Sequence, residues 1–238
     1  MNIVIIGGSQ KIKDSASLLS ANMLVDKIGL LYKKKISVKT YSIKNTSINL
    51  CRGCMNCFNK GLCKLDKEDD MEEVRKFMLS ADYIIFASPI YVGSVSAYMK
   101  SFFDRCSSWM HTMRLIGKKS IIITSSSGNG TELVENYMRI VSSALGMRVS
   151  AILHIIATSV EDVYLEYNQD IIETAAYYVV NKPDVSFNNT ELNIYFNKLL
   201  KYAKYDILGE AEINYWKTTG LINCKNIDSA ENLLKERA

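Results

Sequence analysis

Four cysteines are crowded into one short segment of the sequence: Cys51, Cys54, Cys57 and Cys63. The first three are separated by two residues each, and the last follows after five residues. An iron–sulfur cluster bound by one chain needs several thiolates that converge on one place, and closely spaced cysteines on a curling backbone supply them. Gly53 and Gly61 give the backbone freedom to bend there. The spacing favours a site for a polynuclear iron–sulfur centre.

Three other interpretations of these thiols stay open at this point. A structural zinc site usually pairs two C-x-x-C units across a longer gap than the one seen here. A disulfide cluster needs an oxidising compartment, and nothing in the sequence indicates one. Unliganded cysteines are common as small buried residues, although such cysteines are usually scattered along a chain.

A second group of residues with chemical potential follows the apolar run Ile3 to Ile6. Gly7-Gly8-Ser9 makes a turn there, and a segment with helical periodicity comes next. A strand, a glycine turn and a helix start together present free backbone N–H groups and a positive helix end, which bind anions. The segment matches neither the dinucleotide fingerprint nor the Walker A loop, so a phosphate monoester is the expected anion. Nearby side chains that would add hydroxyl donors or positive charge are Ser9, Ser15, Ser17 and Lys11 or Lys13.

The elements that must position these residues form a regular series along the chain. Apolar or alternating runs predict five strands, and segments with helical spacing separate them. The expected strands cover residues 3–6, 36–41, 83–87, 120–124 and 149–156. Such a series specifies an α/β protein, with an open five-stranded parallel sheet and helices on both faces.

Ligands of open parallel sheets bind outside the carboxyl ends of the strands. Small polar loops at 7–17, 88–94 and 124–130 follow the first, third and fourth strands, so we expect them to meet in one crevice. The segment with the four cysteines follows the second strand and leaves the sheet at the same edge.

The sequence changes character after about residue 157, where strand patterns stop and tyrosines recur among helical segments. We therefore expect a domain at 1–157, with a cysteine-rich loop at 47–66, and a helical extension at 158–238. Tyrosine-rich amphipathic helices pack on a core or form subunit interfaces, and a cap over a substrate is a further interpretation.

The net charge and the distribution of apolar residues indicate which classes of binding partner to expect. The net charge of +4 over 238 residues is modest, and the one tight basic run, Lys33-Lys34-Lys35, falls at an expected helix end. No nucleic-acid partner is expected. The chain starts directly with a strand-like run and has no apolar stretch long enough for a bilayer, so we expect a cytoplasmic protein with reduced thiols and no membrane partner.

Several of these stretches resemble the flavodoxin-like NAD(P)H-dependent FMN reductases, over roughly residues 1–155. The stretches are Gly8-Ser9, the cysteine loop ending in Asp69-Asp70-Met71, Ser88-Pro89-Ile90-Tyr91 with Gly93, and Met99 to Arg105. Within that group, the cysteine spacing is similar to that of the iron–sulfur flavoproteins. The resemblance implies a flavodoxin-like fold, bound FMN, a [4Fe–4S] cluster, NAD(P)H as co-substrate and a homodimer or homotetramer.

The resemblance also assigns roles to positions. It implies that the FMN phosphate is held by Ser9, Lys11, Ser15 and Ser17, with Lys11 where the family commonly has arginine. It implies that the flavin ring and ribityl chain are lined by Pro89, Ile90, Tyr91, Val92 and Gly93. The far side of the ring would be bordered by Ser125, Ser126, Ser127, Gly128, Asn129 and Gly130. The cluster ligands would be Cys51, Cys54, Cys57 and Cys63.

The expected function is that of an FMN-dependent oxidoreductase, which takes hydride from NAD(P)H and passes electrons on, through the cluster where one is bound. The flavin N5 carries this chemistry, so no side chain is expected to act as acid, base or nucleophile. His154 falls in an apolar strand and is expected to be a core residue; His111 is the other histidine. Two alternatives remain, namely a flavodoxin-type electron carrier and a zinc-stabilised α/β interaction module.

Overall fold

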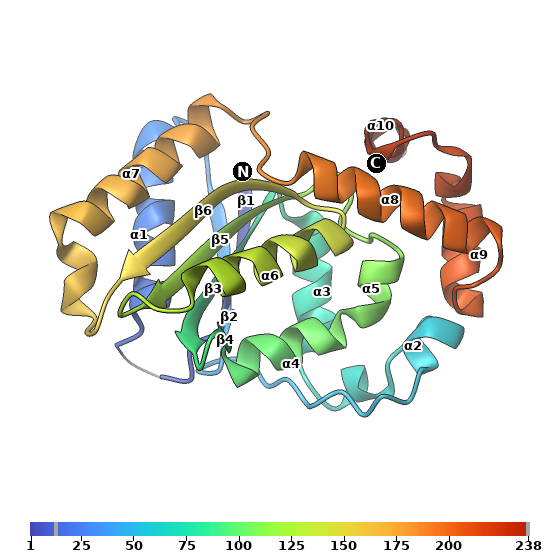
Figure 1. Cartoon of the computed structure of the whole chain (residues 1–238), viewed down its shortest axis with the longest axis horizontal. Helices are drawn as coiled ribbons and strands as arrows, with labels where there is room; N and C mark the ends of the chain where they lie inside the picture. Colours follow the sequence, from blue (N-terminus) through green and yellow to red (C-terminus); the bar gives the residue numbers. More distant parts are fainter. Residues whose placement is uncertain (12–13, 237–238) are drawn as a thin grey trace.

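The computed structural model describes residues 1–11 and 14–236, and Lys13 therefore lies outside the described residues. At its centre is a parallel sheet with the strand order β2-β1-β3-β5-β6 (Figure 1). The strands are β1 (Asn2–Gly7), β2 (Ser37–Ser42), β3 (Tyr83–Tyr91), β5 (Lys119–Ser126) and β6 (Arg148–Ile156). The two-residue β4 (Ser94–Val95) pairs antiparallel with the end of β3, an addition that the sequence did not predict. The predicted α/β fold with an open parallel sheet is confirmed.

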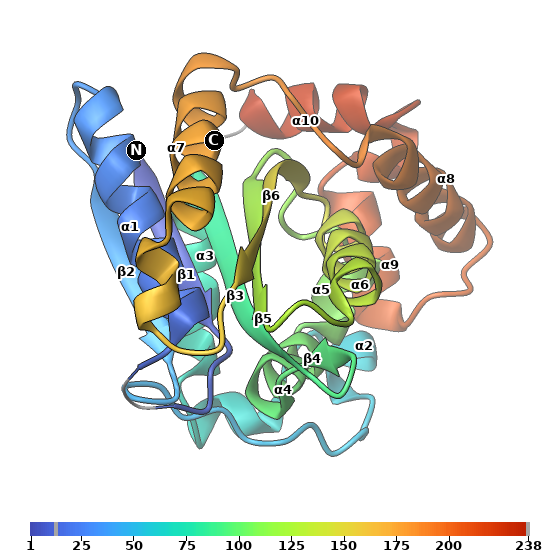
Figure 2. The ribbon, with the colours of Figure 1, turned by 60° about the vertical axis from the view of Figure 1, so that its left-hand side comes forward.

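Helices cover both faces of this sheet, as Figure 2 shows. One face is covered by α1 (Ala16–Leu31) and α7 (Glu166–Asn181). The other is covered by α3 (Met71–Ser80), α4 (Ala97–Arg105) and α6 (Thr131–Ala144). The central strands have apolar residues throughout because both of their faces are buried by helices.

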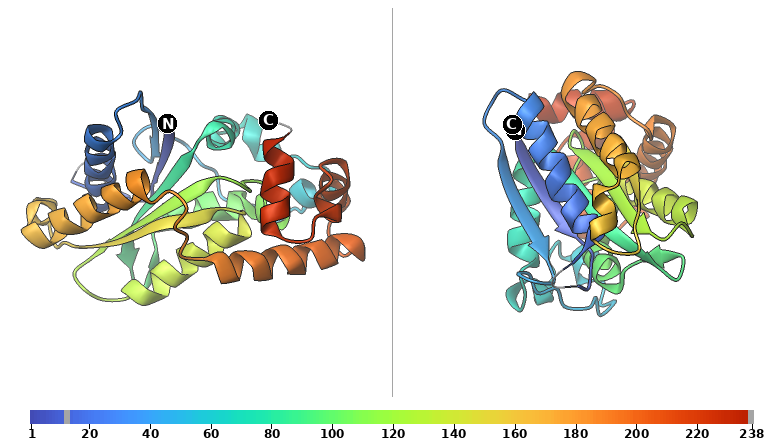
Figure 3. Two further views of the ribbon diagram at one scale, coloured as in Figure 1. Left: turned by 90° about the horizontal axis from the view of Figure 1, so that it is seen from above. Right: turned by 90° about the vertical axis from the view of Figure 1, so that its left-hand side faces the viewer.

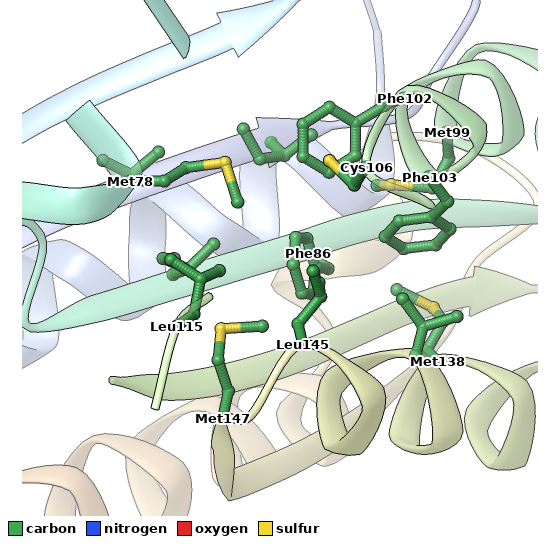
Figure 4. Packing of buried hydrophobic residues seen from close by; sticks show 14 of the residues in the cluster. Met78, Phe86, Met99, Phe102, Phe103, Cys106, Leu115, Met138, Leu145 and Met147 are labelled. Carbon is green, nitrogen blue, oxygen red and sulfur yellow. The ribbon is translucent and has the colours of Figure 1, made fainter. Parts of the chain in front are cut away.

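The larger hydrophobic core lies between the sheet and the second of these faces (Figure 4). Phe86 of β3 is completely buried there and packs against Phe102 and Phe103 of α4, with ring centroids 6.1 and 5.3 Å away. Truncating such a phenylalanine to alanine typically costs about 3–5 kcal/mol of stability. This packing fixes α4 against the sheet, and α4 in turn positions both of the sites described below.

The chain beyond β6 is helical, as predicted, but its parts pack in two different places. Helix α7, which follows the short η2 (Glu161–Tyr164), packs on α1 and completes the first face of the sheet. The remainder, called the tail here (residues 189–235), gathers at the opposite end of the molecule (Figure 3). It comprises α8 (Asn189–Lys204), α9 (Glu210–Thr218), η3 (Leu221–Asn223) and α10 (Ile227–Lys235). A domain boundary after residue 157 stays a prediction.

The tail has a hydrophobic core of its own. Phe196 of α8 and Trp216 of α9 are fully buried, with ring centroids 5.6 Å apart. Met113 and Ile116, from the connection between α5 (Ser107–His111) and β5, complete this core. The tail is therefore attached to the sheet domain by apolar packing.

The cysteine segment (residues 47–66) contains only short pieces of helix. They are α2 (Asn56–Asn59) and the start of η1 (Lys64–Lys67). Among the residues that the structure describes, no helix is long and apolar enough to cross a membrane.

Candidate functional site

A cleft of about 350 Å³ opens at the carboxyl ends of the strands, and we call it the strand-end cleft. It is formed by the carboxyl ends of β3 and β5 and by the loops that follow β1, β5 and β6. The described residues that line it are Ser9, Lys11, Asp14, Ser15, Ala16, Ser17, Pro89, Ile90, Tyr91, Ser125, Ser126, Ser127, Ala157, Thr158 and Ser159. Its size is within the range usual for small-molecule sites, and many of its residues are serines and threonines.

One end of the strand-end cleft is the N-terminus of α1. The Ser15 hydroxyl caps this helix by accepting a hydrogen bond from the Leu18 N–H at 3.3 Å. Ser15 and Ser17 hydroxyls lie 3.4 Å apart, and the Ser9 hydroxyl accepts from the Lys11 N–H at 3.1 Å. A helix N-terminus carries partial positive charge, so this cluster of hydroxyl groups is suited to an anion such as a phosphate monoester.

Next to the cleft, two serines and a glycine that do not line it connect the end of β1, β3 and the start of α4 by hydrogen bonds. The Ser96 hydroxyl donates to the Gly8 carbonyl and accepts from the Met99 N–H, which caps α4. The Ser88 hydroxyl accepts from the Ser96 N–H at 3.2 Å. A Cβ atom at Gly8 would lie 2.9 Å from that of Met99, so only glycine fits this crossing of β1 and α4.

A strained hairpin turn directly follows β3, which continues to Tyr91 and so runs beyond the strand predicted at 83–87. Val92 and Gly93 both have positive φ, 52° and 67°, as in a type I′ turn between β3 and β4. Asparagine, aspartate or glycine is usual at both positions, and a β-branched residue there is an outlier. The Val92 side chain is fully exposed. Strain of this kind concentrates at functional sites, so the hairpin belongs with the cleft as a candidate ligand-contacting element.

The structure brings together ten of the positions predicted for this site. Ser9, Lys11, Ser15, Ser17, Pro89, Ile90, Tyr91, Ser125, Ser126 and Ser127 all line the cleft. Val92, Gly93, Gly128, Asn129 and Gly130 do not line it and lie in the two adjoining loops. These loops touch each other, because a Cβ atom on Gly130 would be 3.1 Å from Gly93 Cα.

The sequence analysis missed the loop after β6, which contributes Ala157, Thr158 and Ser159 to the cleft. The signal was present, since the carboxyl-end rule applies to the last strand as well as to the others. Next to this loop, His154 is half-buried, and its Nδ1 lies 2.9 Å from the Thr124 hydroxyl. Burial lowers the pKa of His154, so the neutral ring is favoured.

The four predicted cysteines surround a second, smaller cavity of about 260 Å³, called the cysteine cavity. Its walls include Cys51, Cys54, Cys57 and Cys63, together with Phe58, Leu65 and Ser107. Burial raises the pKa of the Cys57 thiol, and the negative charges of Cys63 and Cys51 raise it further, against a hydrogen bond with Ser108. Cys57 therefore lies near both Cys51 and Cys63.

The described residues contain no group of three or more His, Cys, Asp or Glu side chains that could hold a single metal ion. A mononuclear zinc site needs its sulfurs about 2.3 Å from one point. In a [4Fe–4S] cluster each thiolate binds a different iron, so the thiolates stand around a volume instead. The four cysteines line one such volume, the cysteine cavity.

A buried arginine, which the sequence analysis did not single out for this role, fastens both ends of the cysteine segment. Arg105 ends α4, and its side chain is 1 % exposed. Its guanidinium donates to the Asn49 carbonyl at 3.1 Å, just before the first cysteine. It also pairs with Asp66 at 2.6 Å and with Asp69, both beyond the last cysteine. Arg75 forms a further ion pair with Asp66.

Asp69 is the fully buried member of this network. Burial by itself would raise the pKa of the Asp69 carboxyl. Hydrogen bonds from Arg105 and from the backbone N–H groups of Asn49 and Met71 outweigh burial and leave the pKa below its usual value. The carboxylate is therefore charged at neutral pH. The signal in the sequence was an arginine directly after the apolar pair Phe102-Phe103 and Asp104, together with a cluster of acids after the last cysteine.

The tail closes over the outer side of the cysteine segment. At Gly209, which precedes α9, a Cβ atom would lie 2.4 Å from the Phe58 carbonyl oxygen in α2. Phe58 also packs against His111 of α5, with ring centroids 5.0 Å apart. The Trp216 indole N–H donates to the His111 carbonyl at 3.0 Å. Elements α2, α5 and α9 thus form one packed unit (Figure 1).

The strand-end cleft and the cysteine cavity share no lining residue and lie toward opposite ends of α4. The strand-end cleft lies near Ser96 at the start of α4, where Ser96 bonds to Gly8. The cysteine cavity lies near the end of α4, where Arg105 bonds to Asn49 of the cysteine segment. Nine helical residues span about 13 Å. The predicted departure of both loops from one sheet edge therefore does not put the cysteines in the same crevice.

The sequence is similar to one protein family and to several characterised proteins. The family model described as NADPH-dependent FMN reductase matches residues 1–159. An iron-sulfur flavoprotein of Archaeoglobus fulgidus is 28% identical over 223 residues, which is 92% of this chain and 98% of that protein. An iron-sulfur flavoprotein of Methanosarcina thermophila is 33% identical over 106 residues, 44% of this chain and 52% of that protein.

Solved structures share the fold at low identity. An apo NADH:FMN oxidoreductase superposes with a TM-score of 0.58 at 18% identity, covering 76% of this chain and 89% of the other. An FMN-dependent NADH-azoreductase from Bacillus anthracis, solved with FMN, gives 0.57 at 15% identity, covering 76% of this chain and 100% of the other. The flavodoxin-like architecture predicted from the sequence is confirmed.

Proposed function

The chain belongs to the NADPH-dependent FMN reductase family, and from that premise we propose an oxidoreductase that takes hydride from NAD(P)H onto FMN and passes electrons on through a [4Fe–4S] cluster. The family predicted from the sequence is confirmed, and the protein is an oxidoreductase. What remains a proposal is where FMN binds, that a cluster is assembled, that NAD(P)H is the donor, and that copies of the chain form a homodimer or homotetramer.

The observation that carries the FMN proposal is the pairing of the α1 N-terminus with clustered hydroxyls in one cleft at the strand ends. Ser9, Ser15, Ser17 and Lys11 would bind the phosphate. Ile90 and Tyr91 on one side, and Ser125 to Ser127 on the other, would orient the ring system. FMN supplies hydride and electron exchange when bound, and the chain's contribution is binding, orientation and exclusion of water.

The backbone of the chain can also stabilise negative charge at this site. The peptide N–H groups of the loops around 90–93 and 126–129 lie beside the cleft and would face a ring bound there; the Gly128 N–H also donates to the Ser126 hydroxyl at 3.0 Å. Fixed N–H donors favour the reduced, anionic form of a ring lying next to them. This role needs no acid, base or nucleophile from a side chain.

The cysteine cavity supports the second half of the proposal. Cys51, Cys54, Cys57 and Cys63 would hold the cluster, which supplies single-electron transfer when bound. Arg105 would keep the two ends of the segment in place during assembly, since it bonds to Asn49, Asp66 and Asp69. The named likeness to iron–sulfur flavoproteins points the same way.

The experiment is an anaerobic purification followed by an absorption spectrum, with iron, sulfide and flavin assayed on the same sample. Bound FMN with about four iron and four sulfide per chain, as a [4Fe–4S] cluster requires, supports the whole proposal. NAD(P)H oxidation then separates an enzyme from a passive electron carrier. Flavin without iron removes the cluster, and absence of flavin after addition of FMN overturns the proposal.

A further inference from the structure

His154 of β6 lies beside the strand-end cleft, and the function proposed above gives it no role. β6 is the last strand in the pairing order of the sheet, and α6 packs along it (Figure 1). The His154 ring is half-buried between these two elements and β5. Its polar contacts gather around the connection between β5 and α6, residues 127–130, which we call the β5–α6 loop.

One nitrogen of the His154 ring contacts the residues on both sides of the β5–α6 loop. His154 Nε2 lies 3.3 Å from the hydroxyl of Ser126, the last residue of β5. It also lies 3.2 Å from the hydroxyl of Thr131, the first residue of α6. The Ser126 hydroxyl in turn accepts a hydrogen bond from the Gly128 N–H inside the loop at 3.0 Å. A single side chain therefore connects the two ends of the loop and reaches into it through Ser126.

The other ring nitrogen determines where the proton of His154 lies. Its Nδ1 is 2.9 Å from the Thr124 hydroxyl. That hydroxyl has one hydrogen, which it donates to Glu135 Oε1 at 3.0 Å, with the Leu153 carbonyl as a further acceptor at 3.5 Å. Toward His154 the Thr124 oxygen can then only accept, so the neutral ring carries its proton on Nδ1. Its Nε2 is left unprotonated and accepts from the hydroxyls at the ends of the loop.

The neutral form of the ring is essential to these contacts. Burial lowers the pKa of His154 below 6.5, so the ring is neutral at pH 7. A protonated ring has donors on both nitrogens and no lone pair to accept a hydrogen bond. The burial of His154 therefore favours the form that can hold the loop.

The loop held in this way is part of the surroundings of the strand-end cleft. Ser127 lines the cleft. Gly128 and Gly130 have positive φ, 116° and 76°, so the loop has an irregular backbone that glycine allows. A Cβ atom on Gly130 would lie 3.1 Å from Gly93 Cα, which shows how closely the loop packs on the β3–β4 hairpin. A displaced loop would change two sides of the cleft together.

We propose that His154 is a positioning residue for FMN, whose Nε2 accepts hydrogen bonds from Ser126 and Thr131 and so fixes the β5–α6 loop beside the bound ring. The inference rests on the proposed function, because it takes FMN to bind in the strand-end cleft. Fixed N–H donors in the loop favour the reduced, anionic flavin over the oxidised one. A loosened loop should therefore weaken the binding of reduced FMN more than that of oxidised FMN.

Two substitutions separate the two sides of the His154 ring. In His154→Gln the side-chain amide extends to about the position of Nε2 and offers an acceptor to the two hydroxyls of the loop. In His154→Asn the shorter amide reaches only the position of Nδ1, beside Thr124. Val141→Ala is the control, because it removes apolar contacts of α6 in the core, ten residues beyond Thr131.

The measurement uses the full chain reconstituted with FMN. Quenching of flavin fluorescence gives the dissociation constant of oxidised FMN, and the midpoint potential of bound against free flavin then gives that of reduced FMN. His154→Asn should raise the first constant about threefold and the second about tenfold, as the loss of hydrogen bonds implies. His154→Gln should keep both values close to those of the wild type, and Val141→Ala should leave their ratio unchanged.

Thr131→Val tests the same contact from the other side, and it serves even if His154→Asn does not fold. It removes one hydroxyl from Nε2 and changes no residue that lines the cleft. By itself it should raise the dissociation constant of reduced FMN about threefold. Added to His154→Asn it should have no further effect, because the contact is already lost.

Equal losses in His154→Gln and His154→Asn overturn the proposal, because a general packing role of the ring would produce them. An unchanged ratio of the two constants in His154→Asn overturns it as well, as does Thr131→Val with wild-type affinity for reduced FMN. Failure of the proposed function gives a different result: the wild type then binds no FMN, or Ser15→Ala leaves its affinity unchanged, and the inference falls with it.

Discussion

The strand-end cleft and the cysteine segment lie toward opposite ends of α4 and are built in contrasting ways. The cleft is made of short loops that continue directly from buried parallel strands, and its contacts are backbone N–H groups and small hydroxyls. The cysteine segment has little secondary structure and is held from outside, by Arg105 at its two ends and by Gly209 of the tail on its outer side.

Because different contacts hold the two sites, we expect a substitution that disrupts one of them to leave the other folded. Damage to the Arg105 network or to the tail should release the cysteine segment and leave the cleft intact, since the sheet core holds the cleft. Damage at the N-terminus of α1 should weaken the cleft and leave the cysteines in place. Four measurements test that independence.

The largest effect is expected for Arg105→Met. The substitution leaves the Asp69 carboxylate buried without its partner, and removing one member of a buried ion pair costs about 3–5 kcal/mol. We expect the iron content of anaerobically purified protein to fall to near zero, with FMN content nearly unchanged. Lys100→Met on the same helix is the control, because its pair with Asp104 is exposed and contributes about 1 kcal/mol or less. Equal iron in both variants would refute the role of Arg105.

A smaller effect is expected where the tail meets the cysteine segment. Gly209→Ala puts a methyl group against the Phe58 backbone, so α9 has to move, and overpacking of this kind costs about 1–3 kcal/mol. Hydrogen exchange should rise in residues 51–63 and 210–218 and stay constant in the loops of the cleft.

Gly29→Ala is the matched control for that variant. A Cβ atom at Gly29 meets nothing within 4 Å, and the residue lies inside α1. Alanine there should stabilise the protein by about 1 kcal/mol, because glycine is a poor helix former. Faster exchange spread evenly over the whole chain in Gly209→Ala would contradict a local effect.

At the cleft, Ser15→Ala removes the cap of α1, which is worth about 1 kcal/mol of stability. If the FMN phosphate lies there, the dissociation constant for FMN should also rise about tenfold through the lost hydroxyl donor. Quenching of flavin fluorescence measures it. Asn226→Ala removes the corresponding cap of α10 in the tail, and should lower stability by a similar amount with FMN affinity unchanged. A Ser15 variant with normal FMN affinity would move the phosphate elsewhere.

The smallest effect concerns pH at the cleft. Burial lowers the pKa of His154 below its value of 6.5, so the unfolded chain takes up a proton at higher pH than the folded one. The contribution of neutral His154 to stability is therefore complete above pH 6.5 and is lost as pH falls below it.

Urea denaturation at pH 7 and pH 5, compared between the wild type and His154→Asn, measures this contribution. The wild type should lose more stability on acidification. Glu135 bonds to the same Thr124 and has a pKa raised by burial, so its opposite effect is present in both proteins and cancels in the difference. An equal loss in the two proteins would mean that His154 titrates normally.

Much of the cleft could be predicted from the sequence because its determinants are local. Apolar runs specify buried parallel strands, and the loops after such strands must meet at one edge, which brought Ser9, Pro89 and Ser125 together correctly. The contribution of Ala157, Thr158 and Ser159 to the cleft was not predicted, because the same rule was not applied to the loop after β6. The spacing of the four cysteines likewise indicated one shared site, and they do line one cavity.

The arrangement around the cysteines was decided by tertiary contacts that no local pattern encodes. Arg105 reaches Asn49, 56 residues earlier, and Gly209 packs on Phe58 from a helix that follows the whole sheet domain. Local patterning fixes strands and helices because each residue's burial repeats with the period of its element. Which distant groups meet depends on desolvation and close packing in the folded chain, and those forces formed the Arg105 network and packed the tail against the cysteine segment.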